Sequence, residues 1–497
     1  MPSEPGPAPS GPSAPTDVPA VVPEPHACGL EFAGLAVYQG VKVSLLDAAG
    51  LVAQRNAPII EGRRAYFRTF VRYPVGAAAG NVTARLIVSS SVGPVAFSTQ
   101  KKLFEDSTDG SYDTTLDFDV PGEHVLPDSA VSLEIDVGAS CPGGGKQTFP
   151  ATGALPLDAV STGTLRIRLV PVAYEADGSG RLPDLSPEQI TGFHDWLMAL
   201  YPTKAVEIEV REAVRTDMVL TRGDGWEPFL DALRSLRTQD GATADIYYYG
   251  LVSPAESFST YCRNACTAGL SYLASRPTAS LQVGAGVGFS GEIAGETLVH
   301  EVGHQHGRGH TACGGGAGVD ANFPYPSGSI GVWGLDFRTM RLQSPGSRKD
   351  LMGYCQPQWI SDYTFGKIAQ RRSEVSLARV FAAEPLNIRP AGYRSAIVDA
   401  AGGLRLGHPL PAGAEPAGSL EIAEVLDAQG RVVAEVAVSR TPFGHGAGFA
   451  LDLPEPQAHW TSLRLADART VSLLSGRPIP RFEPILPGGG SDRFERR

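Results

Sequence analysis

The chain has 497 residues, a formal net charge of −11 at pH 7, and 42% hydrophobic and 19% charged residues. Its length predicts about three domains, and its composition is that of a globular protein. The acidic balance and the lack of a long basic run argue against nucleic acid as a partner, and no apolar run is long enough to predict a transmembrane helix.

The chain opens with a tract rich in Pro, Ala and Ser, which has nine prolines in its first 25 residues. Such a segment cannot bury a core, so residues 1–26 are expected to form a disordered or polyproline-like tether. No secretion signal is present in the sequence. Either a signal was cut away or replaced, or the protein is cytosolic with a disordered tail.

Residues 27–160 alternate between apolar and polar side chains in short runs, as at 65–72 and 131–137. Turn-forming clusters separate these runs. The pattern predicts an antiparallel β-sandwich, Ig-like in character. The sequence shows no catalytic constellation there, and leaves open whether the region is a spacer or a substrate- or glycan-binding module.

Residues 161–382 mix strand and helix patterns. Ser186, Pro187 and Gln189 form a capping-box start for a helix, and Ser361 is expected to cap another that reaches about residue 381. A third helix is expected at 226–236, and the motif helix is expected to start near Gly291. The predicted strands are 165–172, 206–210, 245–250, 269–273 and 281–284.

The most specific motif is H-E-x-x-H-x-x-G-x-x-H, formed by His300, Glu301, His304, Gly307 and His310. On a helix the first two histidines lie on one face, one turn apart. Gly307 can adopt a positive φ, so the helix can end there and the turn returns the third histidine. Three neutral nitrogens and one open position predict a catalytic zinc site, with Glu301 as the base for a zinc-activated water. A chance match is the alternative.

About forty residues later the chain reads Lys-Asp-Leu-Met-Gly-Tyr-Cys, at 349–355. With this string the chain resembles the metzincin zinc peptidases, in which the long motif is followed by a Met-turn. Met352 matches the methionine beneath the ligands. Tyr354 matches a tyrosine that approaches the zinc or the oxyanion in some branches; an ordinary packed tyrosine is the alternative.

The resemblance implies an α+β fold: a metzincin-like catalytic domain, with a mixed twisted sheet and an active-site helix, flanked by N- and C-terminal β-sandwich domains. It also implies that residues 268–274, with Leu270 and Tyr272, form the sheet edge along which a peptide substrate pairs. A short Trp-Gly-Leu-Asp stretch is similar to one in secreted bacterial mucin-cleaving metzincins. Trp333 could therefore contact an O-glycan, or could simply pack in the core.

Calcium is possible but unsupported: Asp320, Asn322 and Asp336 lie in loops without EF-hand spacing. Residues 383–486 return to short strands, at 420–426, 432–439, 448–453 and 462–465, and predict a small C-terminal β-sandwich. Its three histidines lack metal spacing and are expected to be structural: His408, His445 and His459. Residues 487–497 are expected to be a disordered tail.

The six cysteines fit disulfides in an oxidising compartment. Their grouping suggests that Cys28 pairs with Cys141, Cys262 with Cys266, and Cys313 with Cys355. The last bridge would tie the zinc loop to the Met-turn. A zinc role for Cys262, Cys266 and Cys313, or a latency role for Cys28, are the alternatives.

Together these features predict a secreted or surface-tethered zinc endopeptidase that acts as a monomer on protein or glycoprotein substrates. A mucin-selective glycoprotease is one alternative, which cleavage of O-glycosylated substrates but not casein would indicate. The other is a zinc-stabilised surface binding protein or adhesin without turnover. An adhesin has no need of a base, so Glu301 argues against it.

Overall fold

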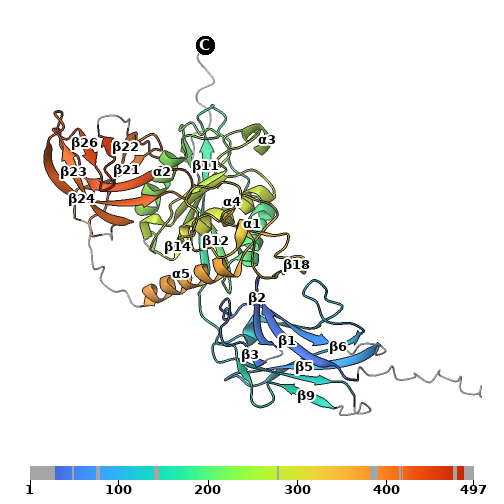
Figure 1. Cartoon of the computed structure of the whole chain (residues 1–497). Helices are drawn as coiled ribbons and strands as arrows, with labels where there is room; N and C mark the ends of the chain where they lie inside the picture. Colours follow the sequence, from blue (N-terminus) through green and yellow to red (C-terminus); the bar gives the residue numbers. More distant parts are fainter. Residues whose placement is uncertain are drawn as a thin grey trace, which may run out of the picture.

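The computed structural model places a β-sandwich, a central sheet with its helices and a C-terminal sheet along one elongated molecule (Figure 1). The tract 1–26, Cys141 and the tail 487–497 lie outside the described residues, and so do the predictions made for them, including the Cys28–Cys141 pairing. The structure describes residues 28–47, 50–73, 79–138, 145–276, 279–380, 390–413, 416, 418–473 and 478–485.

The N-terminal region folds as two facing antiparallel sheets, as the alternating sequence predicts. Alternate residues of its strands are buried, and they form one apolar core. The first sheet has the order β3-β2-β1-β4-β7, with strands Gly50–Leu51, Lys42–Asp47, Glu31–Tyr38, Ala65–Arg72 and Leu116–Val120. The second has the order β10-β8-β5-β6, with β9 also on β8, and strands Leu155–Pro156, Ala130–Asp136, Gly80–Ser89, Val95–Leu103 and Lys146–Phe149. A short 3-10 helix covers Gly122–His124.

A seven-stranded sheet lies at the centre of the molecule. β11 pairs in parallel with β12, β13 and β14, and β16 continues the parallel run on β14. β15 closes one edge in the antiparallel direction. The strands are β11 (Leu165–Tyr174), β12 (Val206–Val210), β13 (Val214–Thr216), β14 (Ile246–Val252), β15 (Gly269–Ser271) and β16 (Val283–Val287), with β28 (Glu483–Pro484) on β13.

The four helices that the sequence predicts begin at the expected residues, and the short α3 is an additional helix. Ser186 accepts a hydrogen bond from the backbone of Gln189 at the start of α1, and Ser361 does the same for Thr364 at α5. Gly291 precedes α4, the motif helix. The helices are α1 (Pro187–Leu200), α2 (Trp226–Gln239), α3 (Phe258–Tyr261), α4 (Glu292–Gln305) and α5 (Asp362–Val380), with 3-10 turns at Ala279–Leu281 and Pro326–Gly328.

The segment after the motif is mostly loop and holds two small sheets. β17 (Gly334–Asp336) pairs with β18 (Arg341–Gln343), and β19 (Lys349–Asp350) pairs with β20 (Gln358–Trp359). These loops contact the N-terminal sandwich: Val41 bridges Gly334, and the indole of Trp359 donates to the carbonyl of Gly40 at 2.8 Å.

The C-terminal region is one seven-stranded antiparallel sheet that packs beside α2 (Figure 1). A buried ion pair joins Arg234 of α2 to Asp452 at 2.8 Å, and His408 lies 2.9 Å from Asp231. Phe443 belongs to the same apolar cluster as residues of the central sheet. The order is β22-β21-β25-β24-β23-β26-β27, with strands Leu404–Leu410, Tyr393–Val398, Phe449–Pro454, Val432–Pro442, Ser419–Leu426, Ser462–Arg464 and Thr470–Ser472.

The expected α+β fold with a metzincin-like catalytic domain was wrong. The described part of the chain is mostly β, with 28 strands against five α-helices. The α+β expectation was based mainly on the single helix that carries the motif. Strands outnumber helices in the described chain, and β pairing occurs in all three regions. The chain end also returns to the central sheet through β28, so the last strand belongs to a different sheet from β21–β27.

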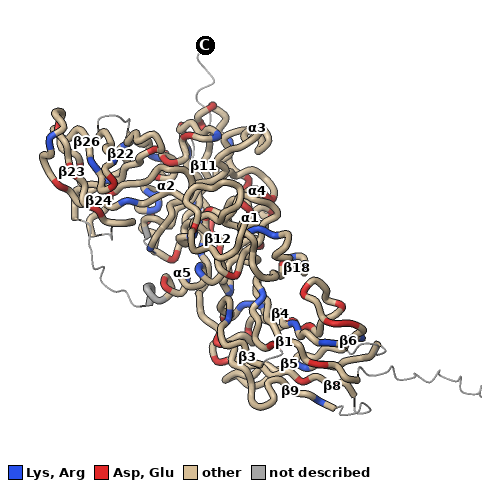
Figure 2. The backbone as a smooth tube through the Cα atoms, in the orientation of Figure 1, with Lys and Arg blue, Asp and Glu red and all other residues tan. Residues whose placement is uncertain are grey.

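Charged side chains of both signs are spread over all three regions (Figure 2). No described helix is long and apolar enough to cross a membrane.

Candidate metal centre

The histidine motif lies on the last turns of α4 and the loop that follows. Gly291, with φ 99°, precedes the helix, and Gly307, with φ 77°, follows its end. A side chain at Gly307 would run into the carbonyl of Ala274, so both the conformation and the close packing favour glycine there. The reversal brings His310 back to the helix. The sequence prediction for Gly307 is thus matched by the backbone.

The imidazoles of the three motif histidines converge. The Nε2 atom of His300 lies 3.1 Å from that of His304 and 3.3 Å from that of His310. Four ligands at the usual zinc–nitrogen distance of about 2.0–2.1 Å lie roughly this far apart when arranged tetrahedrally. All three side chains are buried. The group can therefore hold a metal ion.

The outer nitrogen of each imidazole faces a backbone carbonyl. Nδ1 of His300 lies 2.7 Å from the oxygen of Leu351, and Nδ1 of His304 lies 2.6 Å from that of Arg308. Nδ1 of His310 faces the oxygen of Ala317. A carbonyl can only accept, so each Nδ1 carries the proton and each Nε2 keeps its lone pair. This is the arrangement that orients histidines toward a metal.

The electrostatics keep the three imidazoles neutral. Burial lowers the pKa of His300 to about 3, and it also lowers the pKa of His304 and of His310. The neighbouring imidazoles act in the same direction, because two like charges at this spacing repel. Neutral imidazole is the form that binds metal, so this donor set fits zinc without a prior loss of protons.

Glu301 lies beside the ligands with its carboxylate buried. Burial by itself raises the pKa of Glu301, but the adjacent ring of His445 and its hydrogen bond outweigh burial, so that the net pKa lies below the usual value. The Oε1 atom lies 2.7 Å from Nε2 of His445. The Oε2 atom is buried and has no hydrogen-bond partner among the described residues. An ionised carboxylate with one uncommitted oxygen is suited to take a proton.

Met352 and Tyr354 both lie at the centre, at the turn between β19 and β20. Met352 is fully buried, and a methyl group at Gly303 would collide with its sulfur. The hydroxyl of Tyr354 lies 2.9 Å from Nε2 of His310. Burial, and then the charge of Glu301, raise the pKa of Tyr354, so its hydroxyl keeps the proton and can donate it in a hydrogen bond.

Disulfides hold the loops on both sides of this turn. Cys313 pairs with Cys355, which ties the segment after His310 to the segment after Met352. Cys262 pairs with Cys266. Both pairings confirm the prediction, and they remove these four cysteines as zinc ligands.

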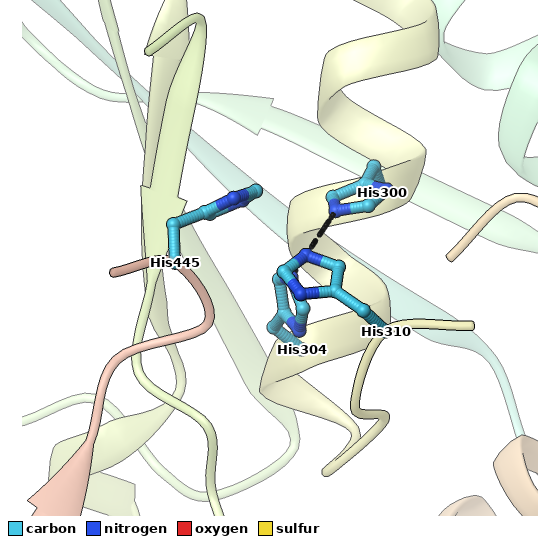
Figure 3. A group of neighbouring side chains, drawn as sticks. All are labelled: His300, His304, His310 and His445. Atoms are coloured by element: carbon cyan, nitrogen blue, oxygen red, sulfur yellow. Dashed lines mark hydrogen bonds between the residues drawn. The ribbon is translucent and has the colours of Figure 1, made fainter. Parts of the chain in front are cut away.

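A fourth histidine, His445, enters the centre from the C-terminal sheet (Figure 3). It lies in the turn between β24 and β25, and its ring faces the motif histidines. One ring nitrogen of each of the four histidines lies within 4.8 Å of the others. Its Nδ1 atom meets the hydroxyl of Tyr354. The sequence analysis expected His445 to be structural, and the structure places it at the site.

Sequence spacing could not have found His445, because 144 positions separate it from Glu301. The sequence does hold a weak signal, because His445 is flanked by Gly444 and Gly446. Glycine allows the backbone to approach another group closely. The other two histidines of the region lie elsewhere. His408 pairs with Asp231 at the contact with α2, and His459 is exposed.

The remaining predicted site residues do not bring side chains to the histidines. Trp333 packs against Tyr38 and its neighbours in the N-terminal sandwich. Leu270 and Tyr272 are buried in the core of the central sheet, so only their backbone borders the edge.

The three loop residues considered as calcium ligands have partners within the protein. Asp336 forms an ion pair with Arg338 at 3.0 Å, and Asp320 accepts from the hydroxyl of Tyr363 at 2.9 Å. The backbone of Asn322 donates to Asp320. The histidines, and not these acids, form the cluster with metal-ligand geometry in the described chain.

No protein-family model matches the chain, and no curated protein matches it. Among solved structures, it is similar to the first C2 domain of human synaptotagmin XIII, with 14% identity, a TM-score of 0.13, and coverage of 26% of this chain and 90% of that one. It is also similar to a calcium-binding mutant of Bacteroides uniformis beta-glucuronidase 2, with 10% identity, a TM-score of 0.15, and coverage of 45% of this chain and 29% of that one. TM-scores this low carry no argument about fold or activity.

Proposed function

We propose that the protein is a zinc-dependent endopeptidase, related to metzincin peptidases through its motif and Met-turn and not through its overall fold. One observation carries the proposal: three neutral imidazoles converge through Nε2, and the buried carboxylate of Glu301 lies beside them with a free oxygen. A purely structural zinc site has no use for a base at its side.

Bound zinc would supply Lewis-acid chemistry at this place, lowering the pKa of a water molecule and polarising the scissile carbonyl. His300, His304 and His310 would hold it through Nε2. Glu301 takes the proton from the attacking water and gives it to the leaving amine, since its carboxylate lies beside the ligands with one oxygen uncommitted. Tyr354 keeps its proton and donates to the negative charge that develops on the carbonyl oxygen.

Two further features support a secreted or surface-tethered protein. Cys262–Cys266 and Cys313–Cys355 are formed, and disulfides persist in oxidising compartments. The bridge at 313–355 also holds the loop that carries the third histidine against the turn of Met352.

The sequence indicated mucin-type glycoproteins through Trp333 alone. The indole of Trp333 packs against the N-terminal sandwich and does not lie at the histidines. We therefore favour general protein substrates.

The test compares wild type with Glu301→Gln on casein and on an O-glycosylated mucin. We expect both proteins to hold equal zinc, and Glu301→Gln to lose roughly 10³-fold in kcat, within the range measured for general bases. Equal turnover by the two proteins would refute the role of Glu301. Cleavage of the mucin alone would assign the glycoprotease, and zinc binding without turnover in both wild type and His445→Ala would favour the binding protein.

A further inference from the structure

The turn between β24 and β25, residues 443–448, lies along the free edge of β15. The backbone of Gly444 donates to the carbonyl of Ser271 at 2.8 Å, and the backbone of Leu273 donates to the carbonyl of Pro442 at 3.0 Å. Tyr272 and Phe443 form an antiparallel bridge between them. These contacts are those of an added strand. We call residues 443–448 the cap turn.

An extended peptide can add as a strand to a sheet edge, and the edge strand β15 lies against the centre, because a side chain at its Gly269 would collide with Glu301. Gly444 of the cap turn already uses the outward carbonyl of Ser271, and Pro442 at the end of β24 uses the outward amide of Leu273. A peptide that extends along this stretch of the edge would need the same two groups. The cap turn therefore stands in the place of a substrate backbone.

The cap turn also covers the histidines. A side chain at Gly444 would collide with the imidazole of His304, so the backbone rests directly on that ligand. The next residue, His445, brings its ring to the side of the three motif histidines (Figure 3). It engages the base, with 2.7 Å between its Nε2 and Oε1 of Glu301, and its Nδ1 meets the hydroxyl of Tyr354.

We infer that the cap turn is an internal inhibitor: it occupies the peptide edge of β15 and puts His445 at the open position of the metal centre. The inference rests on the proposed function, since an inhibitor presupposes a peptidase. His445 engages both Glu301 and Tyr354, the two groups on which that function depends. The structure is the resting form of the protein, and substrate has access once the cap turn moves.

The release is local to the cap turn. The sheet around it is anchored to α2 by the buried pair of Arg234 and Asp452. Three glycines lie within the turn itself, at positions 444, 446 and 448, and Gly446 has φ 76°. Glycine admits backbone conformations that other residues resist. Residues 444–448 can therefore move away from the histidines while β24, β25 and the buried Phe443 stay in place.

The experiment uses His445→Ala and His445→Gln in the full chain, with His459→Ala, an exposed histidine of the same region, as the matched control. Each protein is loaded with Co²⁺, and cobalt content and far-UV circular dichroism check that the variants are folded. Acetohydroxamate, a small chelator that needs the open position, is titrated and followed by visible absorption. We expect it to bind both His445 variants at least tenfold more tightly than wild type or His459→Ala; unchanged affinity would overturn the inference.

A second measurement follows casein hydrolysis by the zinc-loaded proteins. Removing the inhibitor should raise kcat/KM at least tenfold in His445→Ala. A fall in kcat/KM would make His445 a catalytic residue and overturn the inference. If the chelator binds more tightly but no protein cleaves, the cap turn does cover the metal, and the proposed peptidase is what fails.

Discussion

The two flanking β regions differ in what they give to the centre. The N-terminal sandwich shares one apolar cluster with α1, α4 and Met352, and its Arg63 donates to the carbonyls of Met198 and Tyr201 at 2.6 and 2.7 Å. The C-terminal sheet shares an apolar cluster with the central sheet and sends His445 over the motif histidines. The N-terminal sandwich supports the scaffold, whereas the C-terminal sheet adds a histidine to the site through a single turn.

The largest expected effect is on the docking of the C-terminal sheet. Arg234→Met removes the cation of a buried ion pair and leaves the charge of Asp452 in place, which costs up to about 5 kcal/mol of unfolding free energy. Urea denaturation measures the loss. The double variant Arg234→Met, Asp452→Leu should recover most of it, because apolar groups then fill the space. Equal loss in the single and double variants would mean that the charge pair is not what anchors the sheet.

The disulfide next to the centre comes second. The double variant Cys313→Ser, Cys355→Ser opens a bridge between residues 42 positions apart. Loop-closure entropy predicts a loss of about 3 to 4 kcal/mol. Because this bridge holds the loop of His310, zinc affinity should fall as well. The matched variant Cys262→Ser, Cys266→Ser opens a bridge that closes a much smaller loop, and it should leave zinc affinity unchanged. An equal fall in zinc affinity in this variant would contradict a specific role of Cys313–Cys355 at the metal centre.

Arg63→Ala tests the scaffold side of the comparison. The guanidinium is buried and donates to carbonyls at the end of α1, so its loss strands these acceptors and costs about 2 to 3 kcal/mol. Zinc content and acetohydroxamate affinity of the folded protein should match wild type. A change in either would show that the N-terminal sandwich also shapes the centre.

The smallest effect is on pH dependence. Burial lowers the pKa of His300, His304 and His310 in the folded, metal-free protein. The unfolded chain, with histidine pKa values near 6.5, binds more protons below that pH, so stability falls as pH falls. Between pH 7.5 and 5.5 the melting temperature of the metal-free protein should drop by a few degrees. A melting temperature that rises over this interval would contradict the sign.

Local sequence signals predicted the helix starts and the motif geometry well. Ser186 and Ser361 bond to residues three positions away, and Gly307 acts through its own backbone conformation. Such local features can be predicted from the spacing of residues along the chain. The disulfide pairs followed from grouping along the chain. The fold class was wrong, because it was taken from one motif helix and not from the number of strands.

The position of His445 could not be predicted, because it depends on how the C-terminal sheet docks on α2. That docking rests on Arg234 with Asp452 and on Phe443 in a shared core, pairs far apart in the sequence. The packing of Trp333 could not be predicted for a related reason: an aromatic residue in a loop packs against whichever domain lies next to it, and here that is the sandwich.

The central claim is that His300, His304 and His310 form the metal centre, and zinc content tests it most directly. Purified wild type, His310→Ala and His459→Ala are dialysed against zinc-free buffer, and zinc per chain is measured by elemental analysis. The account predicts about one zinc per chain in wild type and His459→Ala, and a large loss in His310→Ala, since three-histidine sites depend on every ligand. Equal zinc in all three proteins would contradict it.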